Sequence, residues 1–161
     1  MDPLSWLGLR DSAHGHLAVI QAAVRNVLPD HEAVVVRYVV VVSVLLTRVA
    51  YADGRFVRDE LDHLRALLRR IERLPAEGIE TVCQKLHELV PRLTEEEMTL
   101  CYTELRAITD AKERRQVMRL LAGLARVDGT IAPAEQRELE AIAGELGLAG
   151  DLAAVLAGPA A

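Results

Sequence analysis

Two short stretches of the chain place acidic residues around a glycine in the same order. Residues 53–60 and 128–135 both read Asp-Gly-x-(Phe or Ile)-x-x-x-Glu, and the second copy begins 75 residues after the first. This order matches the second half of an EF-hand calcium loop, but the positions that would begin such a loop hold no carboxylate. Neither copy alone is therefore an ordinary calcium site. Together the copies supply four carboxylates: Asp53, Glu60, Asp128 and Glu135.

The similarity extends beyond the acidic residues. Residues 43–66 and 118–141 are identical at eight of 24 aligned positions. Each copy predicts a helix, a sharp turn whose glycine adopts a left-handed backbone conformation, and a second helix with the glutamate in its first turn. If the two copies pack face to face around a pseudo-twofold axis, they bring the four carboxylates together. Such a cluster is repulsive unless a cation neutralises it, so the sequence predicts a divalent metal site for calcium, magnesium, manganese or zinc.

The same residues have a purely structural interpretation. Asp followed by Gly is a common turn, and Glu in a first helical turn complements the helix dipole. In that case the protein would be a helical adaptor that binds another protein, and the acidic residues would only cap helices. A third hypothesis is a metal-dependent enzyme in which the ion activates water. The sequence offers no nucleophile, histidine base or phosphate-binding loop for such an enzyme.

The elements that must position these residues are predicted to be helices joined by short connections. Apolar residues recur at helical spacing, prolines bound several segments, and Thr94 with Glu97 and Asp110 with Glu113 form capping boxes. The fold class is all-α: one compact bundle of about seven helices built from two pseudo-twofold helix-turn-helix repeats. The helices are expected at residues 17–27, 30–52 with Asp30 as cap, 58–73, 79–89, 94–108, 110–127 and 133–147, with another turn or two at 151–156.

A valine-rich segment, residues 34–50, is the one candidate membrane span. Arg37 and Arg48 interrupt it and leave about half the apolar length that a bilayer requires. We therefore predict a buried helix rather than a span. The residues expected at the centre of the bundle are Val34, Val41, Val44 and Leu45.

Composition excludes several classes of protein. The chain has 161 residues, a net charge of −5 and 3% aromatic residues, which argues against a nucleic-acid-binding surface. The start of the chain has no basic, apolar signal peptide, and Cys83 and Cys101 are predicted to be free thiols in a reducing cytoplasm. The expected organisation is a tail at residues 1–11, a domain at 12–157 and a tail at 158–161.

The two copies of Ala-x-x-Asp-Gly-x-(Phe/Ile)-x-x-x-Glu resemble the tellurite-resistance TerB family. The resemblance covers roughly residues 30–148, and its specific part lies in the two motifs. It implies a seven-helix TerB-like fold in a cytoplasmic protein of bacteria with a role in tellurite-type stress response. The resemblance also implies divalent metal binding by a cluster of acidic residues, which here would be Asp53, Glu60, Asp128 and Glu135. Our first hypothesis is a non-enzymatic protein with an unidentified protein partner.

Overall fold

Helices make up all the regular structure that the chain displays. The computed structural model describes residues 15–52, 54, 58–69, 76–126 and 129–157, and no strand occurs in them. The all-α prediction is therefore confirmed, and the short helix α8 lies where another turn or two was expected at residues 151–156. The helices are α1 (His16–Val27), α2 (Ala33–Tyr51), α3 (Arg58–Arg69), α4 (Ala76–Leu89), the 3-10 helix η2 (Val90–Arg92), α5 (Glu95–Ile108), α6 (Ala111–Ala125), α7 (Pro133–Glu145) and α8 (Leu152–Ala157).

Local signals in the sequence set most of the helix ends. Both predicted capping boxes form: Thr94 with Glu97 opens α5, and Asp110 with Glu113 opens α6. In the second box the Glu113 amide donates to Asp110 Oδ1 at 2.8 Å, and the Asp110 amide donates back to Glu113 Oε2 at 2.8 Å. Each box satisfies amides that have no partner within the helix.

One predicted cap is wrong. Asp30 does not cap α2, whose N-cap is Glu32 without a side-chain capping bond. The chain first makes a turn after α1, in which the His31 amide donates to the Leu28 carbonyl at 3.3 Å. This turn uses the residues around Pro29, so the helix begins only after it.

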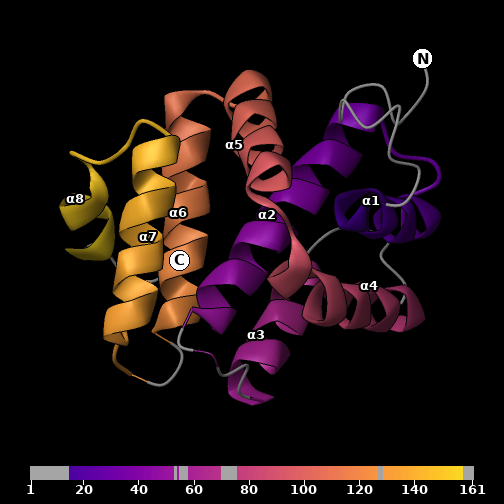
Figure 1. The fold of residues 1–161 in the computed structure, drawn as a ribbon, viewed down its shortest axis with the longest axis horizontal. Helices are drawn as coiled ribbons and strands as arrows, with labels where there is room; N and C mark the ends of the chain where they lie inside the picture. Colours follow the sequence, from indigo (N-terminus) through magenta and orange to yellow (C-terminus); the bar gives the residue numbers. More distant parts are fainter. Residues whose placement is uncertain (1–14, 53, 55–57, 70–75, 127–128, 158–161) are drawn as a thin grey trace.

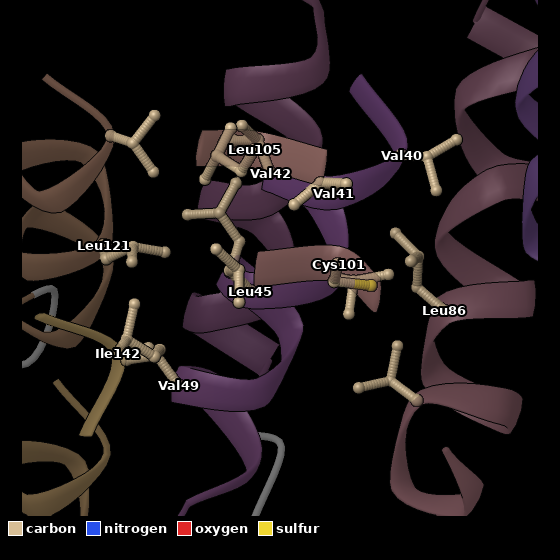
Figure 2. Close-up of a cluster of buried hydrophobic side chains, with 14 of the residues drawn as sticks. Val40, Val41, Val42, Leu45, Val49, Leu86, Cys101, Leu105, Leu121 and Ile142 are labelled. Atoms are coloured by element: carbon tan, nitrogen blue, oxygen red, sulfur yellow. The ribbon is translucent and has the colours of Figure 1, made fainter. Parts of the chain in front are cut away.

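Helix α2 lies at the centre of the bundle. It contacts α1, α3, α4, η2, α5, α6 and α7, and it runs diagonally through the molecule in Figure 1. Figure 2 shows its buried side chains, including Leu45 and Val49, between Leu121 of α6 and Ile142 of α7 on one side and Leu86 of α4 on the other. The hydrophobic core is therefore built around the single helix α2, which the other helices surround.

Burial explains how a valine-rich segment forms this helix. Nine of the 19 residues of α2 are valine, and each costs roughly 0.5 kcal/mol of helix propensity relative to alanine. Burying one such side chain contributes about 1.5–3 kcal/mol, so packing outweighs propensity. Val41, Val44 and Leu45 are fully buried as predicted, whereas Val34 is 38% exposed. Val34 lies in the first turn of α2 and lines an open surface pocket with Ile108 of α5 and Glu113 of α6.

The length and composition of α2 alone would allow it to cross a membrane. It is the one such helix in the described part of the chain, and 67% of its apolar window is buried inside the bundle. The core helix of a soluble protein has the same properties. The prediction of a buried helix is confirmed by the packing of α2 against its neighbours.

A buried carboxylate joins the start of α1 to the start of α5. Glu97, 6% exposed, accepts a hydrogen bond from the Thr94 amide on Oε1 at 3.2 Å, which completes its own capping box. Its second oxygen, Oε2, accepts from the Leu17 amide of α1 at 2.8 Å, 80 residues away in the chain. One side chain therefore satisfies amides at two helix N-termini.

Candidate functional site

The two glycines of the repeated motif have the predicted left-handed conformation. Gly54 has φ 79° and Gly129 has φ 96°. The Gly54 amide donates to the Tyr51 carbonyl at 2.8 Å, and the Gly129 amide donates to the Arg126 carbonyl, also at 2.8 Å. These bonds join residues that correspond to one another in the two copies. The turns after α2 and α6 therefore share the same closing bond.

We expect Gly129→Ala to lower the free energy of unfolding by about 1–2 kcal/mol. No atom lies within 4 Å of the position a methyl group would occupy at this glycine, so the loss comes from the left-handed backbone alone. Gly123→Ala is the matched control, because Gly123 lies in helix α6 with equal space around it. It should stabilise the protein by about 0.5–1 kcal/mol. If urea unfolding shows the same change in the free energy of unfolding for Gly129→Ala and Gly123→Ala, the left-handed backbone at Gly129 does not account for the loss.

The two helix-turn-helix motifs pack against one another. The first consists of α2 and α3 and the second of α6 and α7; α2 contacts α6 and α7, while α3 contacts α6. The C-terminal ends of α2 and α6 and the N-terminal end of α7 lie at the lower end of the molecule in Figure 1. The described helix ends that flank the two turns thus lie at one end of the bundle. The pseudo-twofold relation between the two motifs stays a prediction.

Glu135 is the predicted ligand whose side chain the structure describes. It lies in the first turn of α7 and is 2% exposed. A buried carboxylate is stable only where hydrogen-bond donors or a cation satisfy its charge. The predicted position of this glutamate in a first helical turn is observed, and its burial is unusual because glutamate side chains are mostly exposed.

The other predicted ligands fall outside the described residues or side chains. Asp53 and Asp128 are not among the described residues, and Glu60 is placed in the first turn of α3 without a described side chain. Within the described part of the chain, no three His, Cys, Asp or Glu side chains gather as metal ligands would. The four-carboxylate site therefore stays a prediction.

Two contacts near the motifs were not predicted from the sequence. Arg48 Nε of α2 donates to Glu138 Oε1 of α7 at 3.1 Å and so ties the helix before the first turn to the helix after the second. The Tyr51 hydroxyl lies 2.5 Å from Nδ1 and 3.2 Å from the carbonyl oxygen of His87 on α4. Arg48 is recognisable in the sequence as a charged residue within an apolar segment. Its partner Glu138 could not be identified from the neighbouring sequence.

The cysteines are buried and free, as expected for small core residues. Burial raises the pKa of the Cys83 thiol to about 11 and that of Cys101 to about 12. The negative charge of Glu97 adds to the effect at Cys101. Both sulfurs are therefore protonated at neutral pH, and neither is prepared to act as a thiolate nucleophile or ligand.

Comparison with known proteins agrees with the motifs and the fold. The family model described as "Tellurite resistance protein TerB" matches residues 39–154, which run from the middle of α2 into α8. Neither a curated protein nor a solved structure matches the chain. The match covers both motifs and more than two thirds of the sequence. The chain therefore belongs to the TerB family.

Proposed function

We propose that the protein is a non-enzymatic TerB domain that binds a divalent metal ion at the end of the bundle where its two motifs meet. Asp53, Glu60, Asp128 and Glu135 would hold the ion. Their oxygens are the donors that calcium, magnesium and manganese prefer, and zinc also accepts carboxylates. The ion would supply positive charge that fixes the two motifs against each other.

The observation that carries the proposal is the burial of Glu135. This side chain is enclosed at the start of α7, the helix that follows the second turn and contacts α2 before the first turn. Capping alone needs no such enclosure: the Glu113 capping box of α6 forms at an exposed position, and the buried Glu97 of α5 binds a second group, the Leu17 amide, through its other oxygen. Burial costs a carboxylate its hydration, and a shared cation offsets that cost for a whole cluster.

The biological setting follows from the family. TerB membership supports a role in a bacterial stress response of the tellurite type, in the cytoplasm and with a protein partner. A metal-binding, non-catalytic domain would act there by changing its rigidity or its surface when the ion binds.

We expect divalent metal to raise the melting temperature of the wild-type protein. A ligand at about 100 times its Kd adds roughly 2.7 kcal/mol, which for a chain of this length is a rise of about 5–11 °C. The double variant Asp53→Asn with Asp128→Asn should melt at or above the wild-type temperature in chelator, because repulsion is relieved. It should gain little from metal. Melting curves in chelator and with calcium, magnesium, manganese or zinc measure both effects.

The matched control is Asp30→Asn with Glu96→Gln, which removes the same charge at two exposed positions outside the two helix-turn-helix motifs. This variant should keep the full response to metal. If the wild-type protein responds to none of the four ions, or if the control loses the response equally, the four residues do not form a metal site.

A further inference from the structure

A polar pocket lies beside Arg48 of α2. It has a volume of about 280 Å³ and is bordered by α2, the start of α5, the connection before it and the end of α7. Its apolar lining comes from Leu93, Met98 and the ring of Tyr102, and its charged lining comes from Arg48, Glu95 and Glu145. This volume is at the low end for a ligand site. It suits a group the size of one long side chain and is too small for a nucleotide.

Tyr102 gives this pocket a polar group that can bind a ligand. The residue is only 8% exposed and lines the pocket. Its hydroxyl is not among the fully buried polar atoms without a partner in the described residues, so it is open to the pocket. Burial and the negative charges of Glu138 and Glu145 raise the pKa of Tyr102 to about 12. The phenol is therefore neutral, with an oxygen free to accept a hydrogen bond.

The charges around the pocket favour a cation. Arg48 is paired with Glu138 at 3.1 Å, so its positive charge is already balanced. Glu95 and Glu145 form no ion pair in the part of the chain that the structure describes. Two carboxylates without an ion pair among the described residues therefore line the pocket beside a thioether, a leucine and an aromatic ring, and the Arg106 guanidinium donates to the Glu145 carbonyl oxygen at 2.6 Å. A ring face and carboxylates together attract an ammonium or guanidinium group.

We infer that this pocket binds an alkyl guanidinium or alkyl ammonium group, with its charge between Glu95 and Glu145 and its alkyl stem against Leu93 and Met98. The Tyr102 hydroxyl accepts a hydrogen bond from the cation. The group belongs either to a free amine or guanidine or to a basic side chain of a protein. Glu135, the predicted metal ligand whose side chain is described, does not line the pocket, and the inference uses none of the four predicted ligands.

The test uses n-butylguanidinium and n-butylammonium as probes, with n-butyrate and n-butanol as controls, in calorimetric or NMR titrations of the full chain. We expect both cations to bind in the millimolar range and more weakly as salt rises. Butyrate and butanol should bind at least tenfold more weakly. Tyr102→Phe and Glu145→Gln should each reduce affinity about three- to tenfold without lowering the melting temperature.

Glu95→Gln tests the carboxylate contributed by α5, and Glu96→Gln is its matched control. Both residues lie exposed in the first turn of α5, but only Glu95 lines the pocket. Glu95→Gln should weaken binding and Glu96→Gln should not. Equal losses, binding of butyrate as strong as that of the cations, or no cation binding up to tens of millimolar would overturn the inference.

A blocked peptide with one central arginine separates the two sources of the cation. If the peptide binds more tightly than butylguanidinium, with the same loss in Glu95→Gln, the natural ligand is a protein side chain. If the small cations bind but the peptide does not, the ligand is a free amine or guanidine. Either result supports a cation pocket.

Discussion

Val41→Asp is expected to abolish the cooperative unfolding transition at 25 °C. Val41 is fully buried in α2, the helix that contacts most of the bundle. The substitution removes about 2 kcal/mol of apolar burial and places an unpaired charge in the core. The total loss, on the order of 5 kcal/mol or more, is comparable with the whole stability of an ordinary domain, about 5–15 kcal/mol. Circular dichroism during urea titration would show a sloping curve without a midpoint.

Val34→Asp is the matched control, because it introduces the same charge in the same helix at a position that is 38% exposed. It should unfold cooperatively and within about 1 kcal/mol of the wild-type protein. An acidic residue in the first turn of a helix is also favourable. If Val41→Asp unfolds as cooperatively as Val34→Asp, then α2 is not the centre of the fold.

Glu97→Ala is expected to cost about 3–4 kcal/mol, a large loss for one polar side chain. The substitution leaves the Leu17 and Thr94 amides without their acceptor, and each buried unsatisfied donor costs about 1–3 kcal/mol. For a chain of this length the melting temperature should fall by about 10 °C. Because the Leu17 amide belongs to α1, protection of α1 amides from hydrogen exchange should fall more than that of α6 amides.

Glu113→Ala is the matched control that separates the bond of Glu97 to the Leu17 amide from its role in a capping box. Glu113 occupies the same position in the capping box of α6, but it is exposed and serves one helix only. Its loss should cost about 1 kcal/mol. Glu97→Gln should fall between the two, because the amide keeps one oxygen and presents an N–H₂ group to the other amide. If Glu97→Ala costs no more than Glu113→Ala, the bond to Leu17 contributes nothing to stability.

The sequence predicts this fold well wherever the chain signals its helix ends locally. The capping boxes at Thr94 and Asp110, Pro133 in the first turn of α7 and Gly147 after its end all lie where expected. Asp30 was misleading because a capping residue acts only where the backbone enters a helix, and here a turn intervenes. Val34 was misleading because helical spacing does not tell which apolar residues of a helix stay partly exposed at its end.

In the candidate site the local turn conformations were predictable, whereas the long-range contacts were not. The left-handed conformations of Gly54 and Gly129 follow from the motif, because no other residue adopts them so readily. The bond from Leu17 to Glu97 and the ion pair from Arg48 to Glu138 join residues 80 and 90 positions apart. Such pairs depend on how helices are docked, and the residue types alone do not determine that. The pocket beside Tyr102 is of the same kind.

The valine-rich centre of α2 has a consequence for the protein outside its native state. A run such as Val39–Val42 has high β-propensity, no proline and no charge, which is the composition of segments that stack into cross-β aggregates. Only docking into the bundle keeps it helical. Arg37 and Arg48 flank the run and act as gatekeepers, because their like charges repel neighbouring chains when it is exposed. In the folded bundle the same arginines pair with Glu104 at 2.9 Å and Glu138 at 3.1 Å, so the charges that oppose aggregation are neutralised only once α2 is safely enclosed.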